Sequence, residues 1–157
     1  MSVRQEAYKL IDSMPDRSVS FVISLIKNMS ADFMNGAVVD ESVDEKNSAI
    51  EKLNRISDLD DNWNGNGAMA FSPDHIRNVN TIVSFLSYTP EVFPTAADTI
   101  QLEFDKRDGS HLEIEIPESG MSEYYYVDAE KKDHVGAIKT EVAEINRLVR
   151  DFYESNL

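Results

Sequence analysis

Apolar and polar residues alternate along the chain between Ile100 and Val127. In the stretches IQLEF and HLEIEI every second residue is apolar, and glutamate or glutamine occupies the positions between them. A period of two is typical of a β-strand that buries one face. The pattern therefore predicts a three-stranded antiparallel meander over this region.

The same alternation predicts how the strands are aligned, because cross-strand partners point to the same side of a sheet. The expected partners are Phe104 with Leu112, Leu102 with Ile114, Ile100 with Ile116, Ile116 with Ser122, Ile114 with Tyr124, and Leu112 with Tyr126. This alignment leaves three-residue loops at 107–109 and 118–120. Each loop ends in a glycine, Gly109 or Gly120, and a three-residue hairpin loop favours glycine in that left-handed position.

The polar side of the meander carries mostly carboxylates. With the predicted alignment Glu103 lies opposite Glu113, and Glu115 lies opposite Glu123. Gln101 and Tyr125 are the other two residues of this face. Like charges in directly opposed positions destabilise a sheet by up to about 1 kcal/mol. Two interpretations are open. The face is a solvated surface that keeps a small sheet soluble, or it binds a cationic partner such as a basic protein.

Apolar residues spaced three and four apart predict helices on both sides of the meander. Before it, we expect a helix over 44–59 and a second helix that starts at Ser72-Pro73, where serine caps the helix and proline occupies its first turn. The segment 91–98 is expected to be extended and to lead into the meander. After the meander, a last helix is expected over 135–153, across the buried face of the sheet.

Two short amphipathic helices are predicted at the N-terminus, and they are too small to bury their apolar faces alone. We predict a helical hairpin over 1–36 that is a candidate dimerisation segment, an acidic linker over 37–45 and an α+β domain over 46–157. The predicted fold class is α+β: the hairpin, then a helix–loop–helix, the three-stranded antiparallel meander and a C-terminal helix.

The composition argues against a membrane-spanning protein, a secreted protein and nucleic acid as the main partner. The 157 residues are 41% hydrophobic, include no cysteine and contain no apolar run long enough to span a bilayer. The first residues include Glu6 and Asp12 and do not match a signal peptide, so we expect a cytoplasmic protein. The net charge of −14 argues against nucleic acid as the main partner, because basic patches drive that binding.

The loop between the two central helices, DDNWNGNG, has two interpretations. Four residues match the first, third, fifth and sixth positions of a calcium-binding EF-hand loop, namely Asp60, Asn62, Asn64 and Gly65. The twelfth position, where that loop needs glutamate, is Phe71. The other interpretation is a tight structural turn, in which Gly65 and Gly67 permit positive φ and Trp63 anchors the loop in the core.

Apart from this partial match to an EF-hand loop, no residue pattern of an established catalytic or metal site occurs in the sequence. His75, His111 and His134 lack the spacing of a zinc-binding helix, and we expect all three at the surface. There is also no nucleophile elbow, phosphate loop or dinucleotide fingerprint. The sequence therefore predicts no catalytic residue, no metal ligand and no cofactor.

The segment RQEAYKLIDSMPDRSVSFVISLIKNM, Arg4 to Met29, resembles the N-terminal segment of antitoxins from bacterial type II toxin–antitoxin systems. The resemblance implies an α-helical hairpin and, in that group, a following tail that wraps the toxin. Here the hairpin is followed instead by a folded domain.

A second resemblance covers residues 48–128. The pieces NWNGNGA, FSPDHI, PTAADTIQLEF, HLEIEI and EYYYV resemble an uncharacterised bacterial domain with the motifs NWxGxGA, IQLEW and LEIEI. In this chain Phe104 stands where that domain has tryptophan. The resemblance implies a common fold and carries no known activity.

The predicted function is that of a non-enzymatic, antitoxin-like protein-binding module, which sequesters a basic partner through an acidic surface. A toxin is one candidate for that partner. The expected contact residues are Glu103, Glu113, Glu115, Glu123 and Tyr125. We also expect no membrane partner and a candidate homodimer through residues 3–33. The alternatives are a metal-dependent enzyme centred on the Asp60–Gly67 loop, and a structural or adaptor domain of unknown role.

Overall fold

The computed structural model describes residues 9, 11–14, 19 and 41–154. The chain divides into two compact units, Met1–Val39 and Asp40–Leu157. The hairpin predicted over 1–36, and dimerisation through 3–33, fall almost wholly outside the described residues. The fold and the candidate site lie within the second unit.

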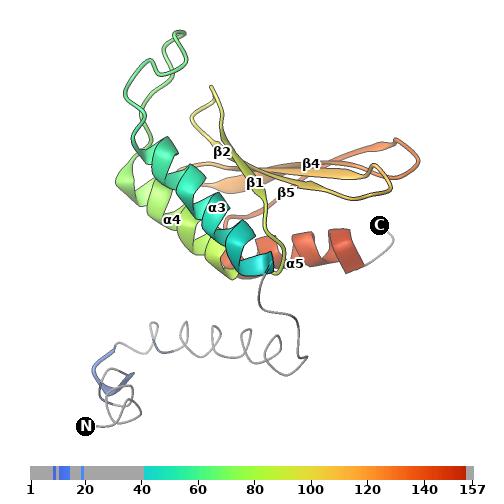
Figure 1. Cartoon of the computed structure of the whole chain (residues 1–157), viewed down its shortest axis with the longest axis horizontal. Coiled ribbons are helices and arrows are strands. Elements are labelled where there is room, and N and C mark those ends of the chain that lie inside the picture. Colours follow the sequence, from blue (N-terminus) through green and yellow to red (C-terminus); the bar gives the residue numbers. More distant parts are fainter. Residues whose placement is uncertain (1–8, 10, 15–18, 20–40, 155–157) are drawn as a thin grey trace. The chain divides into compact units, whose positions relative to one another are not determined.

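The second unit is an α+β fold, as the sequence predicts (Figure 1). Its elements are α3 (Glu41–Ser57), α4 (Pro73–Phe85), β1 (Glu91–Pro94), β2 (Ile100–Asp105), β3 (His111–Ile116), β4 (Met121–Val127), β5 (Asp133–Lys139) and α5 (Val142–Glu154). Helix α3 begins inside the segment 37–45 for which a linker is predicted. Helix α4 begins as expected, because the Ser72 hydroxyl accepts a hydrogen bond from the His75 N–H at 3.1 Å. No helix within residues 41–154 has both the length and the apolar character needed to cross a membrane.

The sheet has five antiparallel strands in the order β1-β2-β3-β4-β5, so the prediction of a three-stranded sheet is wrong. The predicted meander forms its centre in the expected register, with Leu102 opposite Ile114 and Leu112 opposite Tyr126. Both loop glycines are left-handed, with φ of +86° at Gly109 and +102° at Gly120. The error therefore concerns the two outer strands and not the alignment of the inner three.

Strand β5 replaces the first turns of the helix predicted over 135–153, and α5 begins only at Val142. Ile138 has the spacing of the helix face that continues through α5, which is why the sequence pattern favours a helix there. In the strand, Ile138 is half-buried while Val135 and Ala137 point outward and are exposed. Because apolar residues lie on both sides of β5, the alternation that indicates a strand is hidden.

Strand β1 is the other addition, and it lies where the sequence predicts only an extended segment. It has four residues, of which Val92 alone is fully buried, opposite Leu102. Pro94 occupies its last position and has no N–H to donate, which suits an edge strand. So short a strand shows too few alternations to be recognised from the sequence.

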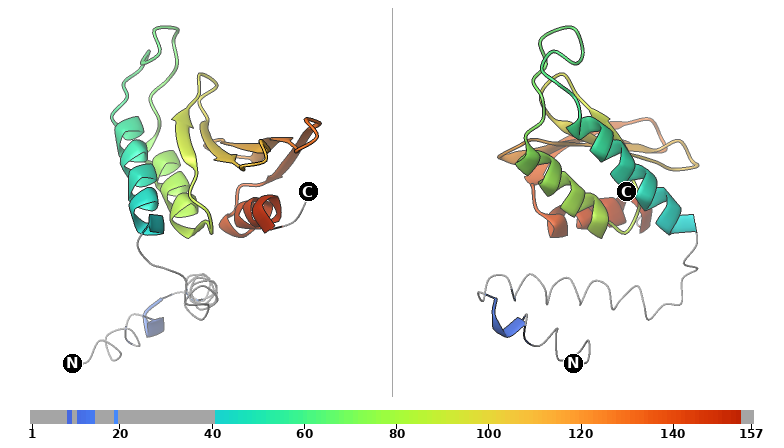
Figure 2. Two further views of the ribbon diagram at one scale, coloured as in Figure 1. Left: turned by 45° about the vertical axis from the view of Figure 1, so that its right-hand side comes forward. Right: turned by 60° about the vertical axis from the view of Figure 1, so that its left-hand side comes forward.

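Helices α3, α4 and α5 lie on one side of the sheet (Figure 2). The strand residues that they cover are those predicted from the alternation, namely Ile100, Leu102, Phe104, Leu112, Ile114 and Ile116. These pack with Leu53 of α3, Ile82 of α4 and Val149 of α5, and each side chain of this size stabilises the fold by about 1.5–3 kcal/mol on burial. The opposite face, called the outer face below, carries no helix from residues 41–154.

Candidate functional site

The outer face presents a grid of side chains whose rows follow the strand pairing. One row runs across all five strands and consists of Glu91, Glu103, Glu113, Tyr125 and Val135. The next row consists of Phe93, Gln101, Glu115, Glu123 and Ala137. The five residues predicted to bind a partner therefore lie together in two adjacent rows. Strand β1 adds a fifth carboxylate, Glu91, to these rows, and strands β1 and β5 add apolar groups; the sequence prediction includes none of these.

The two opposed glutamate pairs occur where the sequence predicts them, with Glu103 opposite Glu113 and Glu115 opposite Glu123. Three of these carboxylates accept a hydrogen bond from a neighbour. The Gln101 amide donates to Glu103 at 2.7 Å, and the Thr99 hydroxyl donates to Glu115 at 3.0 Å. Gln101 and Thr99 are neutral donors, so they orient Glu103 and Glu115 without adding a positive charge.

His111 brings a titratable cation to the edge of this acidic surface. Its Nδ1 lies 2.8 Å from Asp105 and its Nε2 lies 3.0 Å from Glu113. Burial lowers the pKa of His111, but the hydrogen bonds to the two carboxylates outweigh this effect and raise the pKa above the ordinary value. The imidazole therefore retains its proton to higher pH than a free histidine and partly offsets the charge of Glu113.

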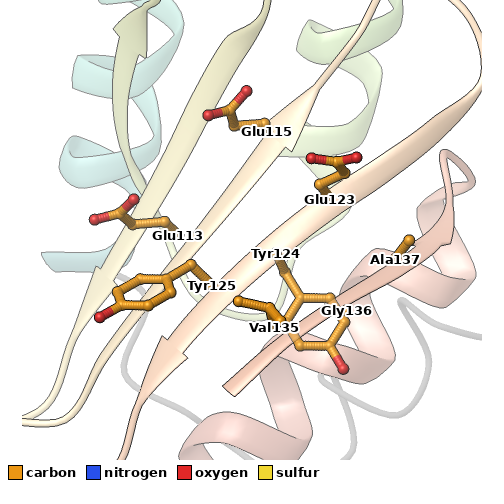
Figure 3. Close-up of a pocket in the computed structure, with 8 residues that line it drawn as sticks. All are labelled: Glu113, Glu115, Glu123, Tyr124, Tyr125, Val135, Gly136 and Ala137. Atoms are coloured by element: carbon orange, nitrogen blue, oxygen red, sulfur yellow. The ribbon is translucent and has the colours of Figure 1, made fainter. Parts of the chain in front are cut away.

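A shallow hollow of about 480 Å³ lies on the outer face. It is lined by Glu113, Glu115, Glu123, Tyr124, Tyr125, Val135, Gly136 and Ala137, which Figure 3 shows as sticks. The carboxylates come from β3 and β4, and the apolar residues come from β4 and β5. The hollow thus offers anionic groups beside a small apolar patch, in which Val135 is 79% exposed.

Lys52 of α3 supplies a positive charge at the β1 edge of the face. Its ammonium forms an ion pair with Glu91 and lies 5.5 Å from the centre of the Phe93 ring. These contacts occupy the β1 side of the grid. The Glu115–Glu123 pair lies on β3 and β4, farther from β1. Glu123 makes no ion pair within the part of the chain that the structure describes.

The DDNWNGNG loop uses its side-chain oxygens for its own backbone. Asn62 Oδ1 accepts from Gly67 N–H at 2.7 Å, and Asn64 Oδ1 accepts from Asn66 N–H at 2.8 Å. Trp63 is part-buried against the core, and its indole N–H donates to the Met69 carbonyl at 3.3 Å. Two oxygens that an EF-hand-like site would need as ligands are thereby engaged, and no group of three or more histidine or carboxylate side chains among the described residues could hold a metal ion.

His75 is buried, which corrects the expectation that all three histidines lie at the surface. It is 2% exposed, and its Nε2 lies 2.9 Å from the Ile116 carbonyl, to which it donates. Its ring also lies beside Phe71, with the ring centres 5.7 Å apart. The contact ties α4 to the end of β3, so the position of His75 is structural.

A second hollow, of about 410 Å³, lies between α5 and strands β3, β4 and β5 on the helix-covered side. Aromatic and aliphatic side chains line it, among them Tyr126 and Phe152. At its rim His134 Nε2 lies 2.9 Å from Asp128, and this hydrogen bond, followed by one from the Lys132 N–H, lowers the pKa of Asp128. The polar groups at this hollow therefore already have partners within the protein.

Comparison with known proteins adds no assignment, since no protein-family model, curated protein or solved structure matches this chain. The resemblances to antitoxins and to the uncharacterised domain stay predictions. The geometry of the outer face is therefore the main ground for a functional proposal.

Proposed function

We propose that this chain is a non-enzymatic protein-binding module that binds a basic protein on its outer sheet face. The contact residues are Glu103, Glu113, Glu115, Glu123 and Tyr125. The observation that carries the proposal is the direct opposition of Glu103 with Glu113 and of Glu115 with Glu123. Solubility alone does not require like charges in opposed positions, because a face of mixed charge would serve as well.

A basic partner would change the energetics of this face in two ways. Its lysine or arginine side chains would relieve the repulsion within each glutamate pair, and the negative potential would steer its approach. Tyr125 and Val135 would supply the apolar contact that a charged interface needs at its centre. Binding of this kind weakens as salt screens the charges.

The N-terminal resemblance adds a class of partner to this proposal. If residues 4–29 form the hairpin of an antitoxin, the basic partner is a toxin, and residues 3–33 pair two copies of the chain. We also infer a cytoplasmic location, which the cysteine-free composition favours because disulfides are typical of oxidising compartments. No cofactor is needed for binding of this kind.

The metal-dependent enzyme centred on the Asp60–Gly67 loop is the weaker hypothesis. Asn62 and Asn64 direct their oxygens to backbone N–H groups of the loop. A metal ion would have to compete with these hydrogen bonds and would lack the glutamate that completes an EF-hand loop.

The test is capture of partners from the native host by the full chain and two double variants. Glu113→Lys with Glu115→Lys reverses charge on the outer face, and Glu51→Lys with Asp58→Lys reverses it at exposed positions on and just after α3. Each double change moves the net charge from −14 to −10, since every acidic-to-lysine change adds two charges. We expect only the outer-face variant to lose a captured basic protein. Equal capture by both variants would contradict the proposal.

A further inference from the structure

Strand β5 ends the sheet with an edge that no other strand covers within residues 41–154. An exposed edge presents unpaired N–H and C=O groups, and proteins commonly protect it with a short strand, proline or a covering element. The opposite edge has such protection, since β1 has four residues, ends in Pro94 and lies against α3 through the Lys52–Glu91 pair. Strand β5 has seven residues, lacks proline and exposes Val135.

The sequence of β5 is complementary to itself when two copies run antiparallel. With Gly136 opposite Gly136 of a second copy, Asp133 lies opposite Lys139, His134 opposite Ile138, and Val135 opposite Ala137. This alignment uses the whole strand and keeps residues of the same face together. It also places opposite charges at both ends of the paired segment.

The side chains concerned lie on one face of the sheet. Asp133, Val135, Ala137 and Lys139 are all exposed in the strand, and they lie opposite Val127, Tyr125, Glu123 and Met121 of β4. Asp133 accepts a hydrogen bond from Tyr125 at 2.9 Å, and Lys139 lies 4.0 Å from Glu141. Both existing contacts are at the surface, where such interactions are weak and exchange readily.

We propose that two copies of this chain associate through β5 in this register, around a two-fold axis at Gly136. The pairing satisfies the open edge and joins the two five-stranded sheets into one. Val135 and Ala137 of each copy then form an apolar strip on the outer face, flanked by two Asp133–Lys139 ion pairs. This dimer does not depend on the identity of the basic partner, and it uses a different surface from residues 3–33.

The dimer can be tested by charge exchange in the full-length chain. Lys139→Asp or Asp133→Lys alone places like charges opposite each other twice per dimer, and we expect each to raise the dimer dissociation constant by about tenfold or more. The double variant Asp133→Lys with Lys139→Asp restores opposite charges and should recover the wild-type constant to within about threefold. Arg55→Asp, at an exposed position of α3, is the control for a change of charge elsewhere and should have no effect.

Mixing the two single variants gives a second readout by sedimentation. The Lys139→Asp chain carries two acidic ends on β5 and the Asp133→Lys chain carries two basic ends, so the mixture should form heterodimers although each variant alone is mainly monomeric. A wild-type chain that stays monomeric, or a dimer that the single changes do not weaken, would overturn the proposal. So would a double variant no better than the singles.

A crosslinking experiment covers the case in which the charge variants fold poorly. The chain has no cysteine, so single cysteines introduced as Val135→Cys and Ala137→Cys are unique. Opposed strand residues have the separation that a disulfide requires. Under oxidation we expect disulfide-linked dimers when the two variants are mixed and few when either is alone. Absence of linked chains in the mixture would refute the register.

Discussion

Glu103 and Glu113 lie directly opposite each other on β2 and β3, on the face of the sheet that none of α3, α4 and α5 covers. Gln101 donates to one carboxylate and His111 contacts the other, so both are held in position. The same relationship recurs between Glu115 and Glu123 on β3 and β4. Opposed carboxylates in fixed positions suit a surface that binds lysine or arginine side chains of a partner. Their mutual repulsion lowers the stability of the free protein.

A substitution at Glu123 measures how much the repulsion between Glu115 and Glu123 destabilises the protein. We expect Glu123→Gln to raise the free energy of unfolding by a few tenths of a kcal/mol, up to about 1, because it removes the repulsion with Glu115. The gain should shrink at high salt, where the repulsion is already screened. Urea unfolding at low and high salt checks both statements. Glu51→Gln on α3 is the matched control, since it changes the net charge equally but leaves the pair intact.

If Glu123→Gln destabilised the protein at low salt, or gave the same result as Glu51→Gln, the opposed pair would not be the source of a repulsion. The outer face would then be an ordinary solvated surface.

His111 predicts a dependence of stability on pH. Its pKa in the folded protein is raised above 6.5, so protonated His111 stabilises the fold fully below that value, and the contribution is lost as the pH rises through the folded pKa. We expect His111→Gln to destabilise the protein more at about pH 5.5 than at about pH 8.5. Unfolding curves of the two proteins at both pH values measure this difference. A larger loss at the higher pH would show that the sign is wrong.

The effect of Gly136→Ala on stability is expected to depend on the side chain at position 124. A methyl group on Gly136 would lie 2.5 Å from Cζ and from the hydroxyl oxygen of Tyr124. We expect Gly136→Ala to destabilise the protein by about 1–3 kcal/mol through overpacking. In a Tyr124→Ala background the same change should stabilise by about 0.5 kcal/mol, because alanine is preferred to glycine in a strand.

The double-mutant cycle of these variants is measured by urea unfolding. Equal effects of Gly136→Ala in both backgrounds would mean that the tyrosine ring does not rest against the strand as described.

The sequence predicted the inner sheet because two signals agreed. The alternation from Ile100 to Ile116 defined the buried face, and glycines at 109 and 120 fixed the loop lengths, so only one register kept that face apolar. No comparable signal marks β5, where Val135 points outward and the spacing of Ile138 continues the helix face of α5. Pairing with β4 makes this segment a strand, and a local sequence pattern does not reveal that pairing.

The candidate site was predictable only in part for the same reason. Its glutamates follow from the register of β2, β3 and β4, but Val135 and Ala137 belong to β5, where the sequence pattern predicts a helix. Glu91 and Phe93 come from a strand of four residues. The sequence predicts His75 at the surface because nothing in its sequence neighbourhood indicates the Ile116 carbonyl, 41 residues away, to which it donates.

The most direct test of the proposed binding face is photocrosslinking in the native host from position 125. A photoreactive phenylalanine analogue in place of Tyr125 should form a light-dependent adduct with a basic protein. The adduct should disappear when Glu113→Lys and Glu115→Lys are present in the same chain. The same analogue in place of Glu51, on α3, should form no such adduct. No adduct from position 125, or identical adducts from both positions, would contradict the claim that the outer face binds the partner.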